Sequence, residues 1–151
     1  MSMNMALLAH LLGVIVWVGG MFFAHIALRP AAAELLQPAQ RLPLLAGALG
    51  RFFKWVAWSI VLILVSGIAA MVMINGAGGR IGVHIHAMAA IGILMMGIFF
   101  HIRFVPFKRL LLAVAVQDWQ AGGAAMAQVR LLVGVNLLLG MGTTVIALVG
   151  R

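Results

Sequence analysis

Four long apolar runs, separated by short basic segments, constrain the fold of this chain more than any other feature. They cover about residues 6–28, 52–74, 81–105 and 131–149. Each run is close to the roughly 20 apolar residues that a helix needs to cross about 30 Å of hydrocarbon. Backbone polar groups inside a bilayer must be bonded within the structure itself, which a helix achieves. We therefore expect an all-α integral membrane protein, with residues 1–151 forming one up-down-up-down four-helix bundle.

The composition agrees with this fold class and excludes several functions. Apolar residues make up 66% of the chain and charged residues 8%, whereas soluble domains carry about 25% charged residues. Cysteine is absent, which excludes disulfides, thiolate metal sites and cysteine nucleophiles. The net charge of +8 resides between the apolar runs, where basic side chains meet anionic headgroups. We expect the lipid bilayer as a partner and no nucleic acid.

The basic residues also predict an orientation. One side of the bundle would carry only Arg80 and the terminal Arg151, and the other side the eight remaining basic residues. Because cytoplasmic loops are enriched in lysine and arginine, both termini should lie outside the cytoplasm, in a bacterial-type inner (plasma) membrane. Pro106 is expected to kink the third helix, and Asp118 to cap the fourth. The eight residues are Arg29, Arg41, Arg51, Lys54, Arg103, Lys108, Arg109 and Arg130.

Histidines occur near both ends of the first and third runs. His10 and His25 are 15 residues apart, and so are His86 and His101. An interval of 15 residues spans about 22 Å of helix and returns to broadly the same side of it. Since these two runs point the same way, His10 and His86 should share an outer level, and His25 and His101 an inner level.

Two stacked histidine pairs suggest two b-type haems, because such a haem takes one imidazole from each of two facing helices. Small residues on the same faces, such as Gly13 and Gly97, would make room for the porphyrin. His84 falls off the shared face and would bind a propionate, carry protons or cap the turn. Propionates could also pair with three arginines near the inner face, Arg29, Arg51 and Arg103.

A copper site is the alternative interpretation of the outer level. Met1, Met3 and Met5 precede His10, and Met71 and Met73 end the second run just before His84 and His86. Thioether and imidazole ligands suit copper, especially Cu(I). A copper site there would leave His25 and His101 unexplained.

Several short motifs resemble the CopD-like membrane family. They are the first-run segment from His10 to Trp17 and Gly20, Gly50-Arg51-Phe52 leading to Ser66-Gly67, His84-Ile85-His86, and Asn136 with Gly140. The first-helix pattern is also similar to that of HemJ-type protoporphyrinogen oxidases. The first resemblance implies copper uptake or resistance. The second implies a haem-b-binding four-helix enzyme with His10 as a haem ligand, although His86 stands where HemJ proteins have a lysine.

Three functions are therefore open from the sequence. The first is a di-haem membrane cytochrome b, a haem-dependent oxidoreductase that passes electrons to or from a quinone or a redox protein. Its iron ligands would be His10 and His86 in one haem and His25 and His101 in the other. The second is CopD-type copper transport or resistance, and the third is HemJ-like porphyrinogen oxidation. A homo-oligomer is compatible with all three.

Overall fold

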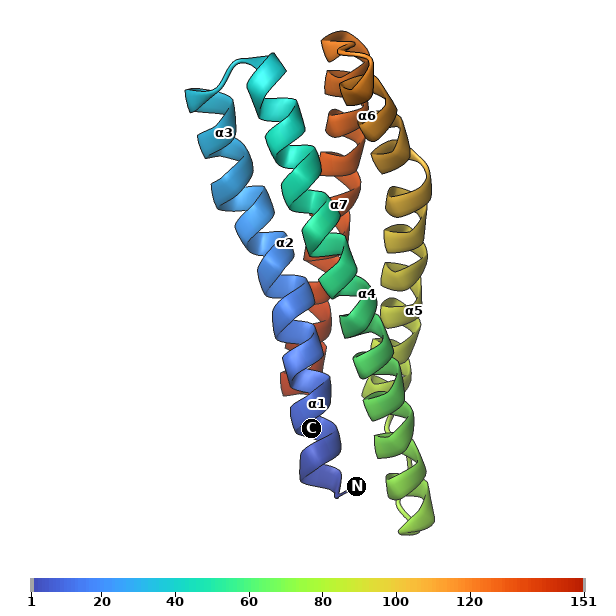
Figure 1. Ribbon diagram of the computed structural model, residues 1–151. Coiled ribbons are helices and arrows are strands. Elements are labelled where there is room, and N and C mark those ends of the chain that lie inside the picture. Colours follow the sequence, from blue (N-terminus) through green and yellow to red (C-terminus); the bar gives the residue numbers. More distant parts are fainter. Residues whose placement is uncertain (1, 151) are drawn as a thin grey trace.

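The computed structural model describes residues 2–150, and four long helical segments account for almost all of them (Figure 1). Segments Met3–Leu35, Pro38–Gly76, Val83–Ala115 and Trp119–Val149 each contain an 18-residue window with mean hydropathy between 2.0 and 2.5. These values and lengths identify a multi-pass membrane protein of four spanning helices, which confirms the predicted fold class. Most side chains in these windows face outward, as expected for helices whose solvent is lipid.

The first span is not a uniform helix. It is built from α1 (Met3–Val14), the π-helical η1 (Ile15–Gly19), α2 (Gly20–Phe22), the π-helical η2 (Phe23–Leu28) and α3 (Arg29–Leu35). Each π turn inserts extra residues into the helical repeat and re-aims the side chains that follow, a feature often found at functional sites.

The other spans are more regular. The second is α4 (Pro38–Gly76), the third is α5 (Val83–Phe104) followed by α6 (Pro106–Ala115), and the fourth is α7 (Trp119–Val149). The break before Pro106 confirms the predicted kink. The Asp118 side chain accepts a hydrogen bond of 2.9 Å from the Ala121 amide, which confirms the predicted cap.

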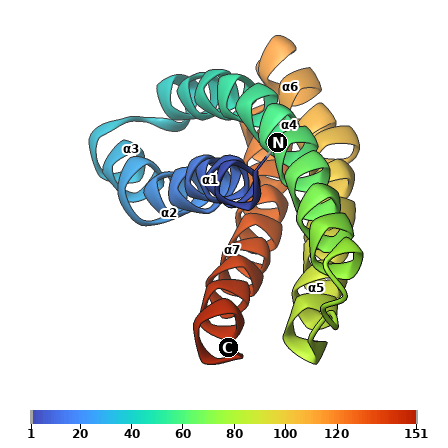
Figure 2. The ribbon, with the colours of Figure 1, turned by 90° about the horizontal axis from the view of Figure 1, so that it is seen from below.

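The bundle has two distinct ends. The terminal end holds the residues next to both termini and the turn between α4 and α5, and the basic end holds α3, α6 and the starts of α4 and α7 (Figure 1). At the basic end the helices continue well beyond the apolar runs, so the segments between those runs are largely helical there. Seen from the terminal end, α1 lies beside α4, and α5 lies beside α7 (Figure 2).

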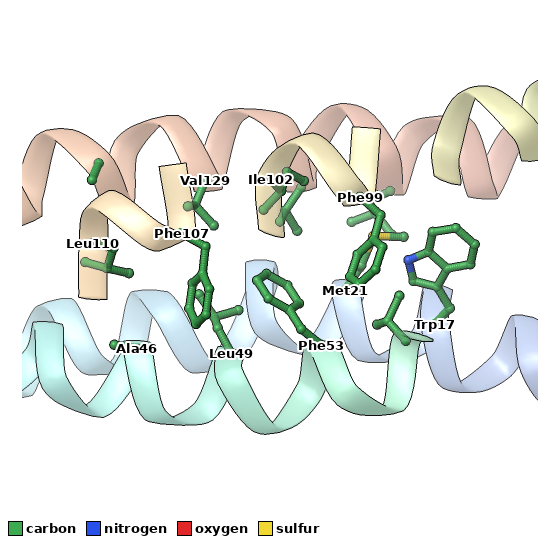
Figure 3. Close-up of a cluster of buried hydrophobic side chains, with 14 of the residues drawn as sticks. Trp17, Met21, Ala46, Leu49, Phe53, Phe99, Ile102, Phe107, Leu110 and Val129 are labelled. Carbon is green, nitrogen blue, oxygen red and sulfur yellow. The ribbon is translucent and has the colours of Figure 1, made fainter. Parts of the chain in front are cut away.

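The apolar core fills the middle of the bundle and the basic end. Phe53 is its centre, because its ring packs edge to face on both Phe99 and Phe107 (Figure 3). The ring centroids lie 5.6 Å apart for Phe53 and Phe99, and 4.9 Å apart for Phe53 and Phe107. Around it pack Trp17, Met21 and Leu49 and the other members of one continuous cluster. This close packing stabilises the bundle, since van der Waals contact is a main source of helix association in lipid.

The terminal end is packed differently. Beyond Ile60 on α4 and Leu137 on α7, the buried residues of the described chain are all small or polar: Ala6, Gly13, Ser66 and Gly140. The helices there are joined by close backbone approach and by polar side chains rather than by large apolar ones. This half of the bundle therefore offers polar groups at membrane depth, which are rare and usually functional.

Three contacts fix how α1 and its continuation lie against α4. A β-carbon at Gly20 would collide with the Phe52 ring, and one at Gly13 would lie 2.8 Å from Ile63 and 3.2 Å from the Ser59 carbonyl oxygen. The third contact is a hydrogen bond between His10 and Ser66. Residues of α1 that lie closer to Met3 contact residues of α4 that lie closer to Met73. The two helices are thus antiparallel, in a register held by glycine.

We predict that Gly13→Val destabilises the protein by about 1–3 kcal/mol, the usual effect of overpacking. The matched control is Gly19→Val, because nothing lies within 4 Å of a β-carbon built at Gly19. Both changes place a β-branched residue in the same span, so the intrinsic cost to the helix is similar. Unfolding in mixed detergent micelles measures the difference. Equal stabilities of the two variants would contradict the close approach of α1 to α4.

Candidate functional site

The most developed polar contact is at the terminal end, between α1 and α4. His10 Nδ1 lies 3.2 Å from Ser66 Oγ, and the His10 ring also rests against Gly67, where a β-carbon would be 3.4 Å from Cε1. Ser66 is buried, and His10 is half-buried. The small residue at position 67 makes room for the imidazole between the helices.

The hydrogen bonds of Ser66 assign the tautomer of His10. The Ser66 hydroxyl donates to the Leu62 carbonyl, at 2.6 Å, and is 3.2 Å from the Ile63 carbonyl. Its single proton is thereby used, so toward His10 its oxygen acts as an acceptor and Nδ1–H is the donor. Nε2 then keeps a free lone pair. A hydrogen bond to the other ring nitrogen is how proteins orient a metal-binding histidine.

His84 and His86 begin α5 at the same end of the bundle. His86 is exposed, and its Nδ1 lies 3.2 Å from the Gly82 carbonyl oxygen, which can only accept. Its Nε2 therefore also keeps a free lone pair for a metal ion. His84 is half-buried between Gly82 and the last turn of α7, where a β-carbon at Gly150 would collide with it. His84 thus helps to join the start of α5 to the end of α7.

The methionines of the copper hypothesis divide into inward and outward ones. Met3 and Met73 are half-buried, whereas Met5 is 62% exposed. In the register fixed by Gly13 and His10, two helical turns beyond His10 bring Met3 opposite Met73. Met71 is half-buried on α4, and Met1 lies outside the described residues.

His25 occupies a separate position near the basic end. It is half-buried in η2, with its ring against Gly134 of α7, where a β-carbon would lie 3.1 Å from Cε1. Arg29 and Arg130 line the same hollow. Two other predicted propionate partners have different surroundings: the Arg51 guanidinium donates to the Gly47 carbonyl oxygen at 3.3 Å, and that of Arg103 lies 5.4 Å from the centre of the Phe107 ring.

The face of α5 that was expected to line a haem points away from the bundle. All five of its residues are exposed: His86, Ala90, Ile93, Gly97 and His101. Instead, Met95 and Phe99 of α5 are buried. The first and third spans meet where Trp17 packs edge to face on Phe99, with 6.2 Å between the ring centroids. Side chains fill the space that a porphyrin between these spans would need.

Haem ligation within one chain therefore does not fit this packing. His10 faces α4 and His25 faces α7, while their expected partners on α5 are exposed. Within residues 2–150, no group of three or more histidine and carboxylate side chains could hold a metal ion. The two haem pairs remain predictions.

Together, the fold and these polar contacts define a multi-pass membrane protein with imidazole and thioether side chains at one end. The family model of copper resistance protein D, CopD, matches residues 46–150. The chain therefore belongs to the CopD family, which confirms the resemblance seen in its motifs. The matched range includes Ser66, Met73, His84 and His86 but not His10. Searches of curated proteins and of solved structures gave no match.

Two residues of these sites are not evident from the sequence alone. From the sequence, Ser66 is predicted only to be a small polar residue at a helix contact, and the structure adds its bond to His10. Arg130 is predicted only to set the orientation in the membrane, and the structure adds its position beside Arg29. The spacing of Ser66, Ala70 and Met73 on α4 is the one available signal, since these residues share a helical face.

We predict that Ser66→Ala changes the tautomer of His10. Without the acceptor oxygen, the Nδ1–H form loses its advantage, and the Nε2–H form becomes populated. Ser59→Ala is the matched control, because Ser59 is also buried on α4 and donates to a carbonyl one turn earlier, Trp55, but has no histidine partner. Nitrogen NMR of ¹⁵N-histidine reports the tautomer. An Nε2–H tautomer in the unmodified protein would contradict the assignment.

Proposed function

We propose that this protein handles copper at the membrane and takes up Cu(I) at the terminal end of the bundle, between α1 and α4. Membership of the CopD family supports copper as the cargo. The observation that carries the proposal is the bond between His10 Nδ1 and Ser66, which leaves Nε2 as a free ligand facing a helix that carries Met73.

Helix geometry favours His10 and Met73 as partners. Seven residues separate Ser66 from Met73, so Met73 lies about 10 Å nearer the terminal end than His10 does. Helical side chains lean toward the N-terminus of their own helix. Because α1 and α4 are antiparallel, the His10 side chain leans toward the terminal end, and the Met73 side chain leans back toward His10. The two side chains converge on the level of Ala6 and Ala70.

The residues at this level suit a small soft ion. Ala6 has no exposed area, so α4 still covers α1 one turn beyond His10, and alanine leaves the longer side chains free to move. A thioether and a neutral imidazole carry no charge, which limits the cost of burying them near lipid. Both bind Cu(I) well. Met3 lies nearer the N-terminus than His10, at the outer edge of this proposed site, where it could pass the ion inward.

We expect Met73→Leu to weaken Cu(I) binding by at least roughly 10- to 100-fold, because removing even a group that only supports a metal ligand costs that much. Met5→Leu is the control on the outward face of α1, and it should leave affinity unchanged. Anaerobic competition with a chromogenic Cu(I) chelator gives both affinities. If the unmodified protein fails to compete, or if the two variants lose affinity equally, this site is not the copper site.

The orientation of the bundle completes the proposal. The eight basic residues at the basic end favour a cytoplasmic location for that end. The proposed copper site would then lie on the outer face. Since the chain has no cysteine, single cysteines at Ala77 and Gln37 can report the two ends. An impermeant maleimide should label Ala77→Cys in intact cells and Gln37→Cys only after permeabilisation. The reverse pattern would place the site in the cytoplasm.

A further inference from the structure

A groove on the outside of the bundle, distant from the copper site, has a chemistry of its own. It runs between η2 and α7, with a volume of about 660 Å³. Along α7 it extends from Arg130 to Met141, a distance of about 16 Å. It is open to the surroundings, since Leu138 is 71% exposed and Phe22 is 52% exposed.

The two parts of this groove differ in polarity. The part toward the middle of the bundle is apolar, lined by Phe22, Leu138, Met141 and similar side chains. The part toward the basic end is lined by Arg29, Arg130 and His25. The sequence contains two carboxylate side chains, Glu34 and Asp118, and neither lines the groove. An occupant must therefore supply negative charge at one end only.

We infer that this groove binds an anionic phospholipid, with its phosphate between Arg29 and Arg130 and one acyl chain along α7. The lipid-facing opening gives such a molecule access from the bilayer, and the position of the charges matches the level of a headgroup. Basic hollows between spanning helices are a recognised way of holding anionic lipid headgroups. Arg29 is half-buried and Arg130 is exposed, and both line the groove.

Gly134 shapes the junction between the two parts. The His25 ring rests on Gly134, and this contact holds the imidazole at the boundary between the charged and apolar walls. His25 is therefore placed to donate a hydrogen bond to a phosphate or glycerol oxygen. His25 of η2 and Arg29, the first residue of α3, both line the groove beside α7.

The test uses the full chain in nanodiscs and in mild detergent. Phosphatidylglycerol and phosphatidylcholine with identical acyl chains are titrated against the protein, and bound lipid is counted by native mass spectrometry. We expect the unmodified protein to prefer phosphatidylglycerol. In the double variant Arg29→Gln, Arg130→Gln this preference should fall by roughly 30-fold, because each basic residue near a headgroup usually contributes about 1 kcal/mol. The double variant Lys108→Gln, Arg109→Gln removes the same charge from exposed positions of α6 and should keep the preference.

Two further measurements separate this occupant from others. Val135→Trp, which fills the apolar part, should lower binding of both lipids while leaving the arginines in place. Glycerol phosphate, which has no acyl chain, should compete poorly, and strong competition would overturn the role of the apolar wall. The proposal is overturned if the two charge variants lose lipid binding equally, or if the unmodified protein shows no preference for phosphatidylglycerol. It is also overturned if the protein has a haem absorption band that disappears in the Arg29→Gln, Arg130→Gln variant.

Discussion

The close antiparallel approach of α1 to α4 is the contact on which the rest of the structure depends. Gly13 lets the two backbones meet near Ser59, and that approach brings His10 within reach of Ser66. In lipid there is little hydrophobic drive between helices, so small residues and close packing determine which faces meet. A larger side chain at Gly13 would separate the helices and remove the partner that assigns the His10 tautomer.

The two ends of the bundle then serve different purposes. The aromatic cluster around Phe53 holds the middle and the basic end rigidly together, which leaves the terminal end free of large buried side chains. Rigid support next to a lightly packed polar region is a suitable arrangement for a site that admits and releases an ion. The basic end, in turn, carries the arginines expected to meet anionic headgroups.

The sequence predicted the four spans, the Pro106 kink and the Asp118 cap because each follows from local chemistry. It could not predict which face of each helix turns inward, since every face of these helices is apolar enough for lipid. The α5 residues His86 and His101 share a helical face with Gly97, and that spacing suggested a haem. Packing of Met95 and Phe99 against Trp17 turned the opposite face inward.

The site was only partly predictable for the same reason. His10 and Met73 are candidate copper ligands by residue type, but Met5 has the same chemistry as Met73 and faces outward. Deciding between them requires the register of α1 on α4, which depends on contacts between distant parts of the chain. The role of Ser66 likewise becomes visible only once the two helices are in place.

X-ray absorption spectroscopy of the Cu(I)-loaded protein tests the central claim most directly, because it identifies the atoms bound to the metal. We predict sulfur and imidazole nitrogen together in the coordination shell, with loss of the sulfur contribution in Met73→Leu and of the imidazole contribution in His10→Gln. A shell of oxygen or nitrogen without sulfur, or a spectrum unchanged in both variants, would contradict a copper site between α1 and α4.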